Sequence, residues 1–152
     1  MEILEKLGHI YSGALTEVIA TVTGIHLNVE SMESENELGD IIGAMCLTGK
    51  KNGILFVSAN KDDIRIMCSR FIGIPVEEVM EKDIDDTICE LVNMTAGSAK
   101  LRLGDTDYMF SLTQPFSIKG KDISIVTKAI THVIAGTLSD GKISVKFKAV
   151  YS

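Results

Sequence analysis

The chain opens with a helical pattern of apolar side chains and continues with an acidic stretch. Apolar residues within 2–22 recur at the three- and four-residue spacing of one helix face, and Gly24 follows as a stop signal. These residues are Leu4, Leu7, Tyr11, Leu15, Val18 and Val22. Residues 30–40 are rich in glutamate and are expected to form a solvated loop. The pattern predicts a long helix packed on a core, followed by a connection in solvent.

A hairpin and two shorter helices are predicted next. Residues 43–59 hold two apolar runs around an Asn-Gly pair at 52–53, and this pair favours a tight hairpin turn with positive φ. A helix is expected over 61–73, with Asn60 as its N-cap. A further short helix is expected after Pro75.

The second half begins with another long helix and then turns to strands. This helix is expected to start within 82–86, where Asp83 or Asp85 can cap it. From 107 onward the pattern favours strands. The predicted strands cover residues 107–120, 121–129, 131–138 and 142–150. A second turn signal at 139–141 joins the last two strands as a hairpin.

Both halves of the chain therefore run from a long helix to a hairpin. Residues 6–14 align with 90–98 without a gap and share a glycine at the same place. We predict a single domain over 1–152 with an internal pseudo-repeat, its halves at about 2–73 and 84–152.

Composition and charge exclude several classes of function. The 152 residues are 45% hydrophobic, which is enough for one core, and the formal charge is −6 with no cluster of Lys or Arg. Nucleic acid and anionic membranes would repel such a surface. The N-terminal residues lack the features of a signal peptide and no stretch reaches transmembrane length, so a cytoplasmic protein is expected. Cys46, Cys68 and Cys89 lie in apolar surroundings and are expected to be buried, reduced thiols that bind no metal.

The second long helix carries the candidate chemistry. At 3.6 residues per turn, one face holds Asp86, Glu90, Asn93, Gly97 and Lys100. The opposite, apolar face holds Ile84, Ile88, Leu91, Val92, Ala96 and Ala99, while Met94 and Leu101 lie beside the polar face. Asn and Gly are poor helix formers, so helix propensity does not explain their presence. A glycine on this exposed strip would let the backbone of another molecule approach.

A carboxylate and a carboxamide three residues apart suit one kind of hydrolysis. Glu90 can accept hydrogen bonds from a cation, and Asn93 can orient a water molecule without removing its proton. Phosphoryl transfer depends mainly on positioning and charge stabilisation, so it matches this pair. The chain has no phosphate-binding GxxxxGK[ST] loop and no metal-ligand cluster, so a partner would supply the phosphoryl group and metal. By spacing alone, an ordinary solvated helix is the commoner explanation.

A longer motif links this helix to a known family. Asp86, three residues, Glu90, two residues and Asn93 are followed after 21 residues by Pro115, and the GSAKLRL stretch at 97–103 lies between them. This pattern resembles the CheC/CheX/flagellar-switch phosphatases of bacterial chemotaxis, with the proline one residue closer than usual. A single motif, on the second helix only, is more similar to CheX than to CheC. The equivalent positions of the first helix hold Lys6 and His9, so one site per chain is expected.

The resemblance implies a fold, a reaction and partners. The fold would be α/β, with two long helices packed on an extended antiparallel sheet. The reaction would be hydrolysis of the aspartyl phosphate on a CheY-type response regulator, with Glu90 contacting the regulator's lysine and Asn93 orienting the water. The regulator would hold Mg²⁺, so no cofactor is expected on this chain. A homodimer joined by sheet edges is also implied, with 142–150 as a candidate edge.

Five residues of the second helix are expected to bind the regulator, namely Asp86, Met94, Gly97, Lys100 and Leu101. Two other hypotheses stay open. One is a non-catalytic module that docks a signalling or flagellar-switch partner through the same face. The other is an unrelated structural domain in which the motif is accidental. The sequence leaves the identity of the regulator open as well.

Overall fold

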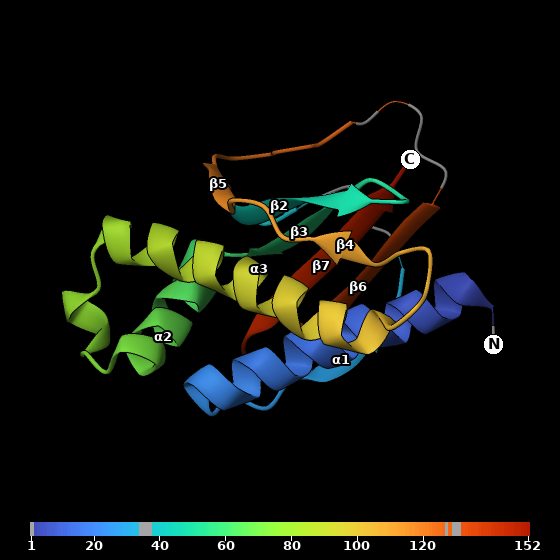
Figure 1. The fold of residues 1–152 in the computed structure, drawn as a ribbon. Helices are drawn as coiled ribbons and strands as arrows, with labels where there is room; N and C mark the ends of the chain where they lie inside the picture. The colour runs from blue at the N-terminus through green and yellow to red at the C-terminus, as the bar shows by residue number, and fades with distance from the viewer. Residues whose placement is uncertain (1, 34–37, 127, 129–131) are drawn as a thin grey trace.

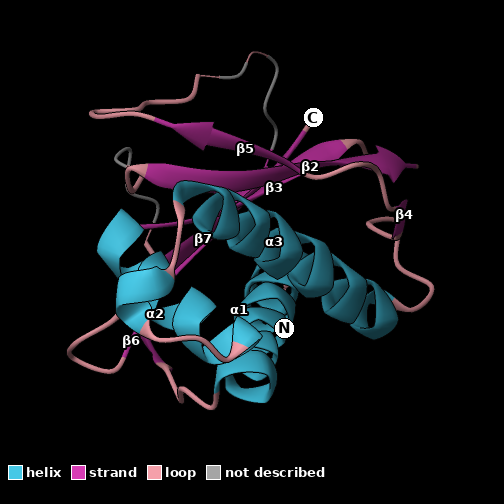
Figure 2. Cartoon of the chain, turned by 90° about the vertical axis from the view of Figure 1, so that its left-hand side faces the viewer, coloured by secondary structure: helices cyan, strands magenta, loops and turns pink. Residues whose placement is uncertain are grey.

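The protein is described by a computed structural model over residues 2–33, 38–126, 128 and 132–152. Its strands form one antiparallel sheet, and the helices α1, α2 and α3 lie together on one face of that sheet (Figures 1 and 2). The helical elements are α1 (Ile3–Thr23), α2 (Lys61–Ile72), the 3-10 helix η1 (Val76–Glu78) and α3 (Glu81–Leu103). The strands are β1 (Asn28–Ser31), β2 (Ile41–Gly49), β3 (Gly53–Ala59), β4 (Phe110–Ser111), β5 (Phe116–Lys119), β6 (His132–Ser139) and β7 (Ser144–Tyr151). This architecture confirms the predicted α/β fold with two long helices on an antiparallel sheet.

The sheet mixes strands from the two halves of the chain. Its order is β1-β6-β7-β3-β2-β4, and β5 also pairs with β2. The strand β7 is therefore central, because it pairs with β6 on one side and β3 on the other. The prediction that 142–150 forms an exposed edge is wrong, because its alternating pattern comes from one buried face and one half-buried face of a central strand.

The ends of the first two helices follow their predicted signals with one difference. Gly24 ends α1 with a left-handed φ of 74° and donates its N–H to the Ala20 carbonyl. Asn60 is the N-cap of α2, but its side chain makes no capping hydrogen bond. Asp40, which is distant in sequence, provides the capping hydrogen bond instead, because its Oδ1 accepts the Lys61 N–H at 2.6 Å.

The hairpin β2–β3 has a different turn from the predicted one. Leu47 pairs with Gly53, and neither residue of the Asn-Gly pair has a positive φ. The side-chain oxygen of Asn52 accepts the Gly49 N–H at 3.2 Å and closes the turn. A Cβ on Gly53 would lie 2.5 Å from the Val150 carbonyl oxygen. The glycine is therefore needed for close approach to β7 and not for turn geometry.

Three further predictions differ from the structure. The strand β1 extends into the expected acidic loop at residues 30–31, and residues 34–37 of that loop lie outside the described residues. The segment 121–129 is not a strand where it is described, at 121–126 and 128. Cys46 is exposed, although Cys68 is buried and Cys89 half-buried, and all three are free thiols. Alternate residues of a strand face opposite sides, so apolar neighbours in sequence do not bury Cys46.

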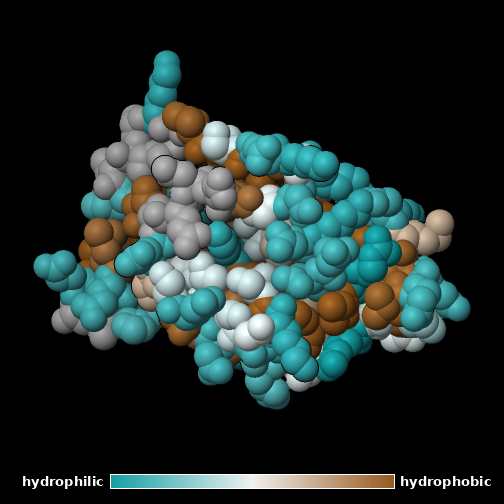
Figure 3. Space-filling view, turned by 180° about the vertical axis from the view of Figure 1, so that it is seen from behind, coloured by the Kyte–Doolittle hydropathy of each residue, from teal (hydrophilic) through white to brown (hydrophobic). Residues whose placement is uncertain are grey.

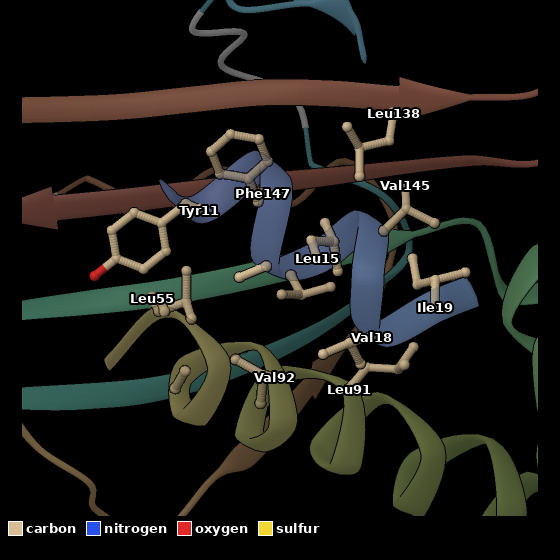
Figure 4. Close-up of a cluster of buried hydrophobic side chains, with 14 of the residues drawn as sticks. Tyr11, Leu15, Val18, Ile19, Leu55, Leu91, Val92, Leu138, Val145 and Phe147 are labelled. Atoms are coloured by element: carbon tan, nitrogen blue, oxygen red, sulfur yellow. The ribbon is translucent and has the colours of Figure 1, made fainter. Parts of the chain in front are cut away.

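The main core lies between the helices and the sheet (Figure 4). The helix α1 contacts β6 and β7, while α3 contacts β2 and β3, and the two helices pack on each other. Fully or nearly fully buried side chains at this meeting point are Leu15, Val18 and Ile19 of α1, Leu91 and Val92 of α3, and Val145 and Phe147 of β7. Each long helix thus packs on the strands of the other half of the chain, and the position of α3 depends on both halves.

The opposite face of the sheet carries a smaller apolar cluster. It consists of Ile42, Ala44, Phe56 and Val150, with partly buried Ile123 and Ile125 packed against it. Seen from behind the view of Figure 1, the described surface is largely hydrophilic, with apolar patches between the hydrophilic residues (Figure 3).

A buried tyrosine pair ties α1 to the last strand. The hydroxyls of Tyr11 and Tyr151 hydrogen-bond to each other inside the core, and the Tyr108 ring packs edge-on against Tyr151 at 4.9 Å. Burial raises the pKa of Tyr11 well above its usual value and raises the pKa of Tyr151 to about 12. Burial thus holds both hydroxyls in the neutral form.

We predict a loss of stability at alkaline pH that depends on this pair. The unfolded chain releases the tyrosine protons near pH 10, whereas the folded protein keeps them to higher pH. Stability is therefore complete below pH 10 and falls as the pH rises through the folded values, by up to about 1.4 kcal/mol per pH unit for each tyrosine. Urea unfolding at pH 8 and pH 11 should show a smaller decrease for Tyr11→Phe than for the wild type. An equal decrease in both proteins would contradict this explanation.

Candidate active site

The helix α3 is stabilised at both ends although Asn93 and Gly97 disfavour it. It begins at Glu81, and Asp83 in its first turn accepts the Met80 N–H at 2.9 Å. Acidic residues in the first turn and basic residues in the last turn complement the helix dipole. The predicted start within 82–86 is therefore slightly late, because Met80 is the N-cap and Asp83 supports it from the first turn, while Asp85, the alternative cap, pairs with Lys119.

The faces of α3 agree with the sequence pattern. The six predicted core residues, Ile84, Ile88, Leu91, Val92, Ala96 and Ala99, are at most 2% exposed. On the outward strip Asp86 and Glu90 are exposed, and Asn93 is half-buried one turn further along. Among the described residues none forms an ion pair with Asp86 or Glu90. The strip thus presents the Glu90 carboxylate and the neighbouring Asn93 amide where another molecule can reach them.

One flank of the strip runs beside β5. Lys119 of β5 pairs with Asp85 at 3.0 Å, and the Ser117 side chain hydrogen-bonds Cys89 one turn further along α3. The strand and the helix therefore run antiparallel, two strand residues for each helical turn. Pro115, the proline of the sequence motif, directly precedes β5 in the chain and is half-buried.

The electrostatics of this flank follow from the same contacts. The hydrogen bond to Asp85 raises the pKa of Lys119, which keeps this pair charged. Burial raises the pKa of the Cys89 thiol, and the carboxylates of Asp86, Asp85 and Glu90 raise it further, while Ser117 opposes the shift. Cys89 is therefore a neutral thiol at neutral pH and not an activated nucleophile.

The other flank faces α1 across a groove. We call this the α1–α3 groove; its lining includes Glu17, Val18 and Thr21 of α1 and Met94, Gly97 and Leu101 of α3. Leu101 is 88% exposed, and a Cβ on Gly97 would meet nothing within 4 Å. The groove therefore continues the outward strip of α3 with an open, largely apolar surface.

The end of the groove is closed by an ion pair. Arg102 of α3 pairs with Glu17 of α1, and a Cβ on Gly13 would lie 2.6 Å from the Arg102 guanidinium. The guanidinium therefore covers the glycine of α1 that matches Gly97 in the internal alignment. One glycine of the pair is covered and the other is open, so the two helices are not equivalent as docking surfaces.

Lys6 and His9 do not join the candidate site. Both are exposed on the N-terminal half of α1, and His9 lines a separate groove with Met32 and Val133. Because α1 meets the end of α3 at Arg102, these positions lie beyond that end and far from Glu90. The structure brings Asp86, Glu90, Asn93, Gly97 and their neighbours together and leaves the first-helix residues apart.

Two structural findings bear on other kinds of function. Within the described ranges, no three His, Cys, Asp or Glu side chains gather in a way that could hold a metal ion. No helix in the described part of the chain is long and apolar enough to cross a membrane. The roles of Glu90 and Asn93, and a magnesium ion on the partner, stay predictions.

Sequence reasoning missed the residues that flank the strip. Thr21 and Glu17 come from α1, and Ser117 and Lys119 come from β5, far from α3 along the chain. Helical spacing identifies the face of α3 but contains no signal for what lies beside it. The only sequence signal that connected α1 with this site was the internal alignment, which matches Gly13 with Gly97.

The fold and the exposed acid–amide pair define a class of protein, an α/β domain with a long surface helix over an antiparallel sheet. The family model described as chemotaxis phosphatase CheX matches residues 41–138. The chain belongs to this CheX family, and the resemblance seen in the sequence is confirmed. A search of curated protein sequences gave no match.

Solved structures of several proteins share this fold. CheX from Desulfovibrio desulfuricans is 24% identical with a TM-score of 0.82, covering 97% of this chain and 99% of that one. A CheC-like superfamily protein from Shewanella sp. PV-4 is 22% identical with a TM-score of 0.84, covering 100% and 99%. CheX in the CheX-CheY-BeF3-Mg²⁺ complex from Borrelia burgdorferi is 14% identical with a TM-score of 0.74, covering 94% and 96%.

Proposed function

We propose that this protein is a phosphatase that hydrolyses the aspartyl phosphate of a CheY-type response regulator. One observation carries the proposal: Glu90 and Asn93 lie on an open strip of α3 in a chain of the CheX family. The likeness to a CheX bound to CheY supports a receiver domain as the partner. A docking surface alone needs no water-orienting amide, so the pair favours an enzyme over a simple binding module.

The reaction assigns separate roles to the two side chains. The Asn93 amide oxygen accepts a hydrogen bond from a water molecule and aims its oxygen at the phosphorus in line with the aspartyl oxygen. A bond forms between water and phosphorus, the bond from phosphorus to the aspartyl oxygen breaks, and the water proton leaves with inorganic phosphate. The Glu90 carboxylate accepts a hydrogen bond from the regulator's lysine and aligns the two proteins.

The regulator is proposed to bring the metal and the phosphoryl group. Its Mg²⁺ would neutralise charge on the phosphoryl oxygens. No cofactor on this chain is part of the proposal. A homodimer joined at a sheet edge remains a further prediction; β1 pairs with β6 only at 137–139, which leaves the 132–136 stretch of β6 without a strand on that side among the described residues.

The direct test is phosphate release from phosphorylated CheY-type regulators of the same cell, with Mg²⁺, with and without this protein. Acceleration beyond the regulator's own hydrolysis supports the phosphatase. Detectable binding without acceleration for every regulator would favour a non-catalytic docking module. Neither binding nor acceleration would favour a structural domain.

We predict that Glu90→Ala weakens docking as well as turnover. Removing the carboxylate removes a charge-assisted contact that forms before the reaction and persists in the transition state. Such contacts contribute about 1.5–3 kcal/mol, so we expect an increase in KM of about tenfold or more. Steady-state kinetics and a titration of the regulator would measure both effects. Glu78→Ala, at an exposed acid before α3, is a matched control that should leave KM unchanged.

A further inference from the structure

We propose that α1 supplies one side of the regulator-docking surface, and that the α1–α3 groove receives an exposed helix of the receiver domain with an apolar residue at its centre and a basic residue at the end that faces Glu90. This inference rests on the proposed function and extends it to the first helix, which lacks the acid–amide pair. The groove would select among regulators, while Glu90 and Asn93 would act on the phosphoryl group.

The size of a protein–protein contact places the groove inside the footprint of the regulator. A specific interface covers about 800 Å² on each partner, which corresponds to a patch with a radius of about 16 Å. Leu101 lies eight residues beyond Asn93, which is about 12 Å along the helix axis. A folded partner that brings its active site to Asn93 therefore also covers Gly97, Leu101 and the facing residues of α1.

The shape of the groove permits a close approach. Gly97 has no side chain and a Cβ there would have no neighbour within 4 Å, so a partner helix can approach the backbone of α3 at this point. Met94 and Leu101 lie one turn before and after Gly97, and Val18 forms the apolar floor. Leu101 is 88% exposed without a partner, which suits a side chain that is buried on docking.

Charge complementarity indicates the chemistry of the occupant. Glu90 lies one turn before Met94, where the groove begins on α3, and within the described chain it forms no ion pair. The carboxylate of Glu17, whose side chain is 61% exposed, lies at the other end and is shared with Arg102. The end nearest Glu90 is therefore acidic, while Arg102 neutralises the Glu17 end, so the groove fits a partner helix with an apolar centre and a basic residue at the end that faces Glu90.

The same geometry explains why α1 would help to select the regulator but would take no part in the reaction. The surface at Gly13, which matches Gly97, is covered by the Arg102 guanidinium. A regulator cannot approach the backbone of α1 there as it can at Gly97. The ion pair between Arg102 and Glu17 instead closes the end of the groove and limits the position of the docked helix.

Two groove variants and two matched controls test the inference. Thr21→Arg fills the α1 side with a bulky cation, and Leu101→Ser removes the exposed apolar side chain. Thr48→Arg is the control for Thr21→Arg. It makes the same substitution on β2, where the exposed side chain lies on the sheet face away from the helices. Val126→Ser makes a comparable apolar change at a residue that is 89% exposed on a loop. Leu101→Met is a conservative rescue.

Affinity and turnover are measured separately with one regulator. Affinity is measured with the regulator carrying beryllofluoride and Mg²⁺, and turnover is measured with the phosphorylated regulator. We expect each groove variant to weaken binding about tenfold and to raise KM equally, with kcat unchanged within about twofold. The controls and Leu101→Met should match the wild type.

The outcomes separate this inference from the proposed function. If the wild type hydrolyses the phosphate and both groove variants bind as tightly as the wild type, the groove is not a docking surface and the phosphatase stands. If the wild type binds without hydrolysis and the groove variants bind weakly, the groove stands and the phosphatase fails. If the wild type neither binds nor hydrolyses, both are overturned.

Discussion

Replacing Asn93 with alanine is expected to abolish turnover while leaving most of the binding of the regulator. The amide orients the attacking water, so its contribution is made mainly in the transition state and appears in kcat. Losing a positioning contact of this kind costs about 100-fold or more in rate. Asn93 is half-buried on the outward strip of α3, so its side chain is partly packed and still accessible. Phosphate release at saturating regulator would measure the loss.

Two further variants make this prediction sharper. Asn93→Asp keeps the shape and replaces the amide with a carboxylate that the phosphoryl group repels, so it should be inactive too. Asn28→Ala removes an exposed asparagine on β1 and should leave the rate unchanged. Full turnover by Asn93→Ala, with an unchanged unfolding midpoint, would remove Asn93 from the reaction. Equal losses of binding and turnover in Asn93→Ala and Glu90→Ala would contradict their separate roles.

Replacing Gly43 with valine is expected to destabilise the protein by about 3 kcal/mol. Gly43 lies on β2 under α3, and a Cβ there would lie 2.6 Å from the Ile88 carbonyl oxygen. The helix backbone and the strand therefore touch, and an added side chain would force them apart. For a domain of this size such a loss lowers Tm by about 6–12 °C. Thermal and urea unfolding would measure it.

Gly97→Ala, on α3, is the control for an added side chain at a glycine that has free space around it. A Cβ at Gly97 has free space, and alanine is a better helix former than glycine by about 0.8–1 kcal/mol. This variant should therefore be more stable than the wild type, in contrast to Gly43→Val. If both substitutions changed stability in the same direction, the close approach of α3 to β2 would not explain the need for Gly43.

Much of α3 could be predicted because its pattern is local. The direction of a helical side chain follows from its position in the turn, so spacing alone placed Glu90 and Asn93 outward and Ile84, Ile88 and Leu91 inward. The first residue of α3 was harder to predict than its faces. Three acids compete for the cap within a few residues, and Asp85 is taken by Lys119 of β5.

The strands were harder to predict because their faces depend on partners. The alternation of apolar and polar residues in 142–150 is equally compatible with an edge strand and a central strand. The pairing of β7 with β3 and β6 makes it a central strand. Cys46 and Gly53 show the same limit. The exposure of Cys46 depends on its place in the sheet, and Gly53 is needed for the approach of β7 and not for its own turn.

The sequence by itself determined the two long helices, the antiparallel strands and the outward acid–amide pair on α3, because these depend on periodicity over a few residues. Only the tertiary structure decided what stands on either side of that pair. Lys119 and Ser117 of β5 contact Asp85 and Cys89 on one flank of the strip, and Thr21 and Glu17 of α1 flank Gly97. These neighbours are set by packing of the core across the whole chain, where each long helix rests on strands of the other half.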